Sequence, residues 1–340
     1  MKAARLHSFD DIRIEEMPVP VVGPREALIE VKASGICSGD VMPWYIEKKA
    51  PLVLGHEPAG TIVETGAEVK KFRKGERVFV HHHAPCLKCS YCKRGDHVQC
   101  EQWRRSGIIP GGIAEYVLIP EINLHNDTLP LAGNVSYEDA TLVEPAACVV
   151  KSFRRSGIKK GDTVLVLGLG VMGMLHILLA VHYGAEKIIG ADMVDFRLAK
   201  AADFGAGAVV NVKTGNLNDA IAELTDGRGA EIVIVGPNSA EAMQAGIDCA
   251  APGGTVLLFT PAMPDETLTV DPNYLYFRDI NIVTSYSCGP DDTREAMSLI
   301  QSGVITAEKL VTHRFAIDET EKAYRTVARA QDSIKVVITF

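Results

Sequence analysis

The sequence lacks three features that would assign it to other classes of protein. Its first stretch, Met1 to Pro20, has no apolar core followed by a small-residue cleavage site, so we expect no secretory signal. It has no excess of basic residues, and its formal net charge of −8 argues against a nucleic-acid partner. No internal repeat or low-complexity segment is visible. The composition is that of an ordinary globular protein.

An uninterrupted membrane span is also missing. The run from Val164 to Val181 is nearly long enough, but glycines and a histidine break it, and turn signals flank it. A buried strand, a glycine turn and a buried helix fit this run better. We therefore expect a cytoplasmic protein with no membrane partner. In that reducing compartment, eight cysteines indicate metal ligation or burial rather than disulfides.

Two patterns divide the 340 residues. Up to about Pro145, short β-rich runs are separated by glycine and proline. After about Val150, apolar strands alternate with segments of helical period, which predicts a parallel sheet covered on both faces. Six such strands are the number found in a doubly wound dinucleotide fold. The predicted class is therefore α/β.

The segment beyond Ser287 predicts a helix, a strand, an amphipathic helix and a terminal strand, "KVVITF". A lone terminal strand needs a sheet to pair with, and we expect it to return to the first domain. That domain is then discontinuous. The expected boundaries are 1–147 with 288–340 for the catalytic domain and 148–287 for the dinucleotide domain.

The stretch "VLVLGLGVMG" places Gly168, Gly170 and Gly173 at G-x-G-x-x-G spacing between a strand and a helix. The first glycine permits the tight turn, the second lets the pyrophosphate approach, and the third lets helix and strand pack closely. Val171 and Met172 open the helix, whose free N–H groups attract phosphate. This is a predicted dinucleotide site.

The choice between NAD and NADP depends on the end of the second strand. Asp192 stands there, twenty-two residues after Gly170 (192 − 170). A carboxylate at this place accepts hydrogen bonds from the adenosine ribose and repels a 2′-phosphate, which favours NAD. Arg197 lies close enough to meet a phosphate or to stack on adenine, so NADP is the less favoured alternative.

Four cysteines, Cys86, Cys89, Cys92 and Cys100, have the spacing C-x2-C-x2-C-x7-C. Four thiolates this close can surround one tetrahedral zinc completely and leave no position for substrate. An iron–sulfur cluster is a lesser alternative, and a redox C-x-x-C pair would need only two of the thiols. A structural zinc is the preferred interpretation.

A second group is spread along the chain: Cys37 in "SGICSGD", His56 and Glu57 in "LGHEPAG", and Glu144 in "LVEPAA". Cysteine, histidine and carboxylate are the ligands that catalytic zinc uses, with one position open to water or substrate. Taken singly, a residue of any of these types is more often an ordinary core or surface residue than a metal ligand. Their joint occurrence upstream of a dinucleotide domain favours a catalytic metal site.

These motifs occur in order over nearly the whole chain, together with "GICSGDV", "GHEPAGTIVETGAEV", "GGIAEY" and "LVTHRF". The chain resembles the zinc-dependent medium-chain dehydrogenases, and in its motifs the sorbitol (polyol) and threonine dehydrogenase branch most. The resemblance implies a GroES-like, partly open β-barrel with a Rossmann domain inserted before its last elements. It also implies a homo-oligomer, a dimer or a tetramer, of which we expect the tetramer.

The resemblance implies roles for the residues as well. Cys37 and His56 are then ligands of a catalytic zinc, with Glu57 and Glu144 competing for the remaining position, and the four-cysteine lobe holds a structural zinc. The catalytic zinc lowers the pKa of a substrate hydroxyl, and NAD accepts the hydride. The expected substrate is a secondary alcohol such as a linear polyol, a cyclic polyol or a sugar derivative.

The proton relay departs from the family pattern. Relatives carry Ser or Thr two residues after the cysteine ligand and often His five after it, whereas this chain has Gly39 and Met42. We expect His82 or His83 to shuttle the proton instead, with Ser38 as a weaker candidate. An exposed histidine cluster without such a role is an equal alternative.

Trp44 and Tyr45 follow at the place where relatives line the substrate pocket. They could stack on a carbon chain or ring, or else serve as core or as a subunit contact. Two further functions stay open: an L-threonine-type amino-alcohol dehydrogenase, which Gly39 and Met42 count against, and a non-catalytic relative of the family.

Overall fold

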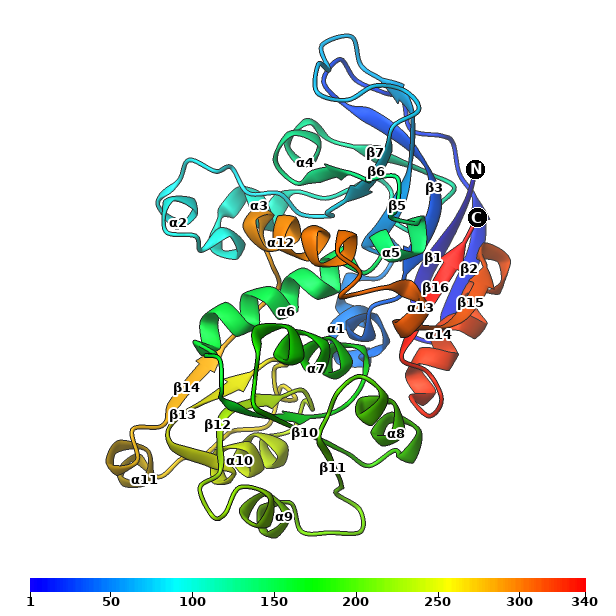
Figure 1. Cartoon of the computed structure of the whole chain (residues 1–340). Helices are drawn as coiled ribbons and strands as arrows, with labels where there is room; N and C mark the ends of the chain where they lie inside the picture. Colours follow the sequence, from blue (N-terminus) through cyan, green and yellow to red (C-terminus); the bar gives the residue numbers. More distant parts are fainter. The chain divides into compact units, whose positions relative to one another are not determined.

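The computed structural model describes residues 1–340, which form two compact units (Figure 1). The first unit consists of residues 1–147 and 288–340, and the second of residues 148–287. No helix in the structure combines the length and the apolar character needed to cross a membrane.

The second unit is built on a parallel sheet of six strands in the order β11-β10-β9-β12-β13-β14. Their inner residues are apolar and buried because helices cover both faces of the sheet. This confirms the doubly wound sheet predicted from the alternating pattern. The strands are β9 (Thr163–Leu167), β10 (Lys187–Asp192), β11 (Ala208–Asn211), β12 (Ala230–Val235), β13 (Ala250–Leu258) and β14 (Asn281–Thr284).

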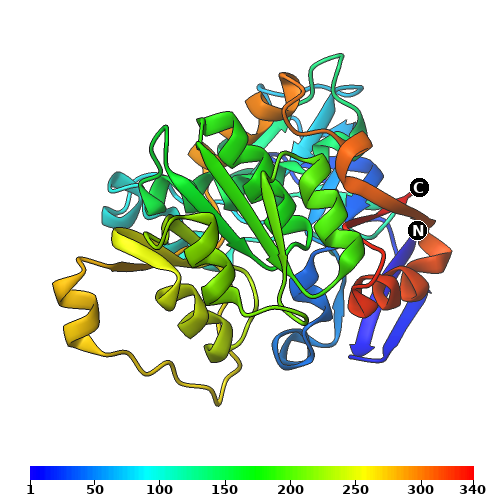
Figure 2. The same cartoon turned by 60° about the horizontal axis from the view of Figure 1, so that its bottom comes forward.

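The helices of this unit divide between the two faces of the sheet, α7 and α8 on one and α9 and α10 on the other (Figure 1). Strand β14 forms an edge, and α11 stands at that end of the sheet in both views (Figure 2). The helices are α7 (Val171–Tyr183), α8 (Asp195–Asp203), α9 (Leu217–Leu224), α10 (Ala240–Asp248) and α11 (Pro272–Phe277).

The first unit contains a seven-stranded sheet in the order β15-β16-β3-β5-β6-β8, with β7 also paired to β3, and a three-stranded sheet in the order β2-β1-β4. Short strands separated by glycine and proline give this mostly antiparallel arrangement. The strands are β1 (Lys2–Ser8), β2 (Asp11–Glu16), β3 (Ala27–Gly35), β4 (Leu52–Val53), β5 (Glu57–Thr65), β6 (Arg77–Val80), β7 (Tyr116–Ile119), β8 (Thr128–Pro130), β15 (Val311–Ala316) and β16 (Lys335–Thr339).

The terminal strand β16 pairs with β3 in antiparallel register, Val337 opposite Gly35, and with β15 in parallel. Its apolar side chains are buried, and Ile338 packs in the same core as Leu6 and Phe315. The chain therefore returns to its first sheet after the second unit, as the lone terminal strand predicts.

Helices and turns carry many of the functional side chains of the first unit. The α-helices are α1 (Pro43–Ile46), α2 (Ser90–Lys93), α3 (Glu101–Arg105), α4 (Glu121–Asn126), α5 (Tyr137–Ala140), α12 (Pro290–Gln301), α13 (Ala307–Leu310) and α14 (Thr320–Arg329). Helix α6 (Val143–Ser156) begins in this unit and continues into the second. The 3-10 helices are η1 (Ser38–Val41), η2 (Glu47–Lys49), η3 (His97–Gln99) and η4 (Ile317–Glu319).

Candidate functional site

Three of the four scattered residues meet in the first unit. Cys37 follows β3, His56 precedes β5, and Glu57 is the first residue of β5. Because β3 and β5 are antiparallel neighbours, with Gly35 opposite Glu57, their ends bring these side chains together. One ligand atom from each lies within 4.8 Å of the other two. A thiol, an imidazole and a carboxylate at this separation suit a zinc ion with an open position.

Asp40 supports this group from η1. Its carboxylate oxygen Oδ2 lies 3.3 Å from Nδ1 of His56, and the Asp40 side chain is buried. A carboxylate on one ring nitrogen of a histidine orients the other nitrogen, which is the usual second support of a metal-bound histidine. The Sγ atom of Cys37 accepts a hydrogen bond from the Gly39 N–H at 3.4 Å.

Glu57 has a partner of its own in the terminal strand. The ammonium of Lys335 donates to its carboxylate and, at 3.1 Å, to the carbonyl of Ile36. Burial raises the pKa of Glu57, and the charge of Lys335 opposes that shift. Gly35 makes the room: a Cβ there would lie 1.9 Å from the Glu57 carboxylate.

Glu144 lies in a different group. It belongs to the first turn of α6, and its carboxylate is within 4.8 Å of ring nitrogens of His81 and His82. The structure thus brings Glu57 together with Cys37 and His56, whereas Glu144 joins two histidines of the "HHH" run. Sequence alone left the two glutamates equal.

The candidates for proton transfer differ in their surroundings. The ring of His82 lies 4.8 Å from that of His56, centroid to centroid, and its Nδ1 is buried without a partner. His83 donates from Nδ1 to the carbonyl of Ser106 at 2.8 Å, and its ring packs on Trp103. Burial lowers the pKa of His82 well below its ordinary value and that of His83 to about 4. Ser38 opens η1, directly after Cys37.

The two aromatic residues expected at a substrate pocket lie on α1. The rings of Trp44 and Tyr45 meet edge to face at 5.8 Å, and Lys49 sits over the Tyr45 ring at 3.7 Å. Nε1 of Trp44 is buried and has no hydrogen-bond partner. Neither ring belongs to an apolar core of this unit, so a role in binding an apolar edge of a substrate stays open to them.

The four cysteines converge around α2 and η3. Their Sγ atoms lie within 4.8 Å of one another, with 3.5 Å between Cys89 and Cys92 and 3.9 Å between Cys86 and Cys92. Four sulfurs around one zinc are separated by about 3.8 Å. Backbone N–H groups, that of Lys88 first, lower the pKa of Cys86 to about 6, which favours its thiolate form. The lobe fits a closed structural zinc.

The glycine turn of the second unit has the shape that its spacing predicts. Gly168 has φ = +83°, a conformation that side chains disfavour, and a Cβ on Gly173 would come 2.1 Å from the Gly168 carbonyl oxygen. A Cβ on Gly170 would meet nothing within 4 Å. Helix α7 begins directly afterwards, so the N–H groups of Val171 and Met172 have no acceptor within the helix.

Asp192 ends β10, as expected, and also holds the glycine turn. Its Oδ2 accepts a hydrogen bond from the Leu169 N–H at 2.6 Å, and its Oδ1 accepts from the N–H groups of Met193 and Val194. Arg197 lies 3.8 Å from the same carboxylate. The sequence predicted the place of this acid but not its bonds to the turn.

Two family models match the chain. That of the alcohol dehydrogenase GroES-like domain covers residues 23–131, and that of the zinc-binding dehydrogenases covers residues 171–302. The chain belongs to the zinc-dependent medium-chain alcohol dehydrogenases. The resemblance seen in the motifs is therefore correct, and so is the predicted combination of a GroES-like domain with a Rossmann sheet.

Relatives of this dehydrogenase include a sorbitol dehydrogenase of Halalkalibacterium halodurans, 33% identical over 98% of this chain and 97% of the relative. An L-idonate 5-dehydrogenase of Vitis vinifera is 31% identical over 98% and 93% of the two chains. Among solved structures, a zinc-binding dehydrogenase of Sinorhizobium meliloti bound to NADP has a TM-score of 0.89 and 29% identity, covering 100% and 99% of the two chains. The protein is thus an alcohol oxidoreductase of the sorbitol-like branch.

Sequence reasoning missed the distant partners of two buried side chains of this dehydrogenase. Lys335 is distant in sequence from Glu57, and Asp127 from His81, so no local motif announces either pair. A lysine in an otherwise apolar terminal strand, "KVVITF", was the one available signal.

Proposed function

We propose that the protein oxidises a secondary alcohol of the polyol class, or reduces the corresponding ketone, with a zinc ion held by Cys37, His56 and Glu57. The meeting of these three ligand atoms, from the ends of two neighbouring strands, carries the proposal. The relatives named for sorbitol and idonate support the substrate class. The four-cysteine lobe would hold a second, structural zinc.

When bound, zinc lowers the pKa of a substrate hydroxyl and a nicotinamide accepts hydride. The chain's own residues prepare for this. Asp40 orients the His56 ring, and Lys335 holds the Glu57 carboxylate in place. The backbone at Gly170 leaves the space in which a pyrophosphate can approach α7.

We prefer NAD as the cofactor. Asp192 places a carboxylate at the end of β10, where it would repel a 2′-phosphate. The Sinorhizobium meliloti relative has NADP bound, which makes NADP the alternative cofactor for this chain. Arg197 is the residue that would meet the 2′-phosphate of NADP. Comparing kcat/KM for the two cofactors tests this choice. A preference for NADP would reject it.

For proton transfer we retain His82 and His83, with Ser38 third. The ring of His82 lies 4.8 Å from that of His56, whereas Nδ1 of His83 donates to the carbonyl of Ser106. The pH–rate profiles of His82→Gln and His83→Gln test both roles, and profiles unchanged in both variants would exclude them.

A homotetramer is our expectation for the assembly. Strand β14 is an edge of the parallel sheet, and a strand of a second copy could extend it. Sedimentation equilibrium tests this expectation, and a monomer would overturn it.

The test of the whole proposal is reduction of NAD and NADP by the zinc-loaded protein across linear polyols, cyclic polyols and amino alcohols. Turnover of a polyol that disappears in Cys37→Ser would support it. Turnover of amino alcohols alone would favour the threonine-type alternative. No turnover in any class, with zinc bound, would favour a non-catalytic relative.

A further inference from the structure

A buried histidine of the first unit is held in one orientation. Nδ1 of His81 lies 2.6 Å from Oδ2 of Asp127, and both side chains are fully buried. The other carboxylate oxygen of Asp127 accepts a hydrogen bond from the Thr293 hydroxyl at 2.5 Å. Since a carboxylate accepts hydrogen bonds, Nδ1 carries the proton. In the neutral ring, Nε2 then carries the lone pair, which accepts a hydrogen bond from the Cys288 thiol.

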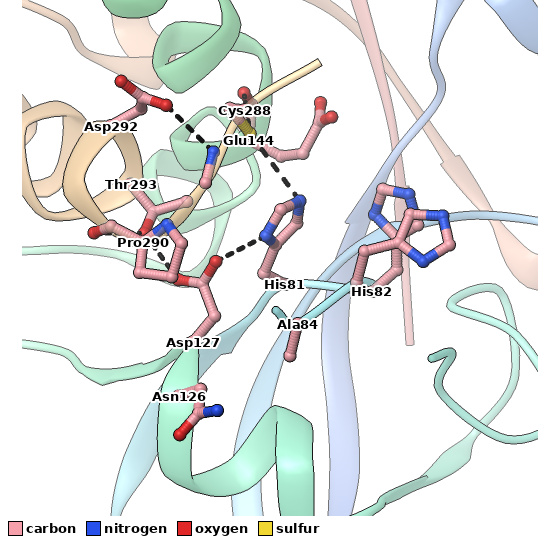
Figure 3. Close-up of polar contacts among 12 residues, drawn as sticks. His81, His82, Ala84, Asn126, Asp127, Glu144, Cys288, Pro290, Asp292 and Thr293 are labelled. Atoms are coloured by element: carbon pink, nitrogen blue, oxygen red, sulfur yellow. Dashed lines mark hydrogen bonds and ion pairs between the residues drawn. The ribbon is translucent and has the colours of Figure 1, made fainter. Parts of the chain in front are cut away.

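That lone pair faces other potential ligands. Figure 3 shows His81 between Asp127 on one side and Cys288 and Glu144 on the other. The Sγ atom of Cys288 lies 3.6 Å from Nε2. One ligand atom each of His81, His82 and Glu144 lies within 4.8 Å of the other two.

We propose that His81, His82 and Glu144 form a further site for a divalent metal ion of the zinc class. Two imidazoles and one carboxylate are a ligand set that zinc and its neighbours in the first transition row accept. A metal-bound histidine usually donates its other N–H to a carboxylate, and Asp127 supplies that support to His81. The buried Nδ1 of His82 has no hydrogen-bond partner in the protein, which agrees with a site that a metal ion from outside the chain would fill.

This set is distinct from the one that contains Cys37. It shares no residue with Cys37, His56 and Glu57, although the rings of His56 and His82 lie 4.8 Å apart. The two sets therefore adjoin, and each can be removed without deleting a ligand of the other. The inference therefore does not rest on the zinc held by Cys37, His56 and Glu57, but it competes with a proton relay through His82.

Metal content provides the first test. The full chain, equilibrated with buffered zinc, should hold one ion more than the two expected for the cysteine lobe and the Cys37 set. The His82→Gln variant should lose that extra ion. The His83→Gln variant is the matched control, since it removes a histidine of the same run that lies outside the set, and it should retain the ion.

A second variant acts on the tautomer of His81 and deletes no ligand. In Asp127→Asn, the amide oxygen can keep the Thr293 hydrogen bond while the amide N–H₂ donates to Nδ1. The His81 proton then moves to Nε2 and blocks metal binding there. We expect this variant to lose the same ion as His82→Gln.

Crystals of the wild-type protein, measured at the zinc absorption edge, keep the test independent of how the variants fold. An anomalous peak between His81, His82 and Glu144 would support the site. No peak there at saturating zinc would overturn it and leave Asp127, His81 and Thr293 as a hydrogen-bonded network without metal. An extra ion that survives both variants would also overturn it, because that ion would lie elsewhere.

A metal-bound His82 could not carry a proton, so this site and a relay through His82 exclude one another. The His82→Gln variant separates them. Loss of one ion marks the site, whereas a shifted pH–rate profile with unchanged metal content marks the relay.

Discussion

Lys335 of the terminal strand forms a buried ion pair with Glu57, and each side chain is about 1% exposed. The two residues are joined by the antiparallel pairing of β16 and β5 with the same central strand, β3. The last strand of the chain thus fixes a candidate ligand of the metal site.

Replacing Lys335 with Met should destabilise the metal-free protein by about 3–5 kcal/mol, because it leaves a buried carboxylate without its counter-charge. Zinc would restore a positive charge beside Glu57. The rise in melting temperature on adding zinc should therefore be larger in the variant than in the wild type. Thermal unfolding with and without zinc measures both effects. An equal rise in the two proteins would argue against Glu57 as a ligand.

The glycine turn offers a pair of matched substitutions. Gly170→Ala should leave the free energy of unfolding within about 0.5 kcal/mol, since its Cβ meets no protein atom, but should weaken dinucleotide binding about tenfold or more. Gly173→Ala should destabilise the fold by about 1–3 kcal/mol, because its Cβ would clash with the Gly168 carbonyl. Urea unfolding and cofactor titration separate these outcomes. Unchanged cofactor affinity in Gly170→Ala would contradict the proposed pyrophosphate position.

Cys92→Ser should remove one zinc from the cysteine lobe and loosen the segment around it. Trp103 packs against this cluster and is 2% exposed, so its fluorescence should shift to the red as water reaches it. Trp44 is the only other tryptophan and provides the constant background. The measurements are metal content and emission maximum, and an unshifted spectrum after zinc loss would show that the lobe keeps its packing without metal.

His176 of α7 should make stability depend on pH. Burial lowers its pKa to about 4, against about 6.5 in the unfolded chain. The unfolded state then binds more protons between these values, so stability should fall as pH drops from 6.5 towards 4. The loss is at most roughly 3 kcal/mol.

The His176→Gln variant should have a flatter stability curve over this range of pH. Urea unfolding at pH 7, 6 and 5 measures it. An equally steep curve in the variant would assign the pH dependence to other groups.

Much of the fold could be predicted because its signals are local. The alternation of apolar strands with helical segments after Val150 specifies the parallel sheet, and the terminal "KVVITF" requires a sheet to join. The cysteine lobe and the glycine turn are equally local, because their residues lie within fifteen and six positions of one another. Spacing alone is enough to place such groups together.

Only the tertiary structure shows which side chains surround Glu57 and which surround Glu144. Both are carboxylates in suitable motifs, and their difference lies in where β5 and α6 deliver them: one beside Cys37 and His56, the other beside His81 and His82. The pairs Lys335–Glu57 and Asp127–His81 depend on the same kind of distant contact. The sequence by itself determined which candidate ligands exist, and long-range strand pairing and helix placement decided which of them lie close together.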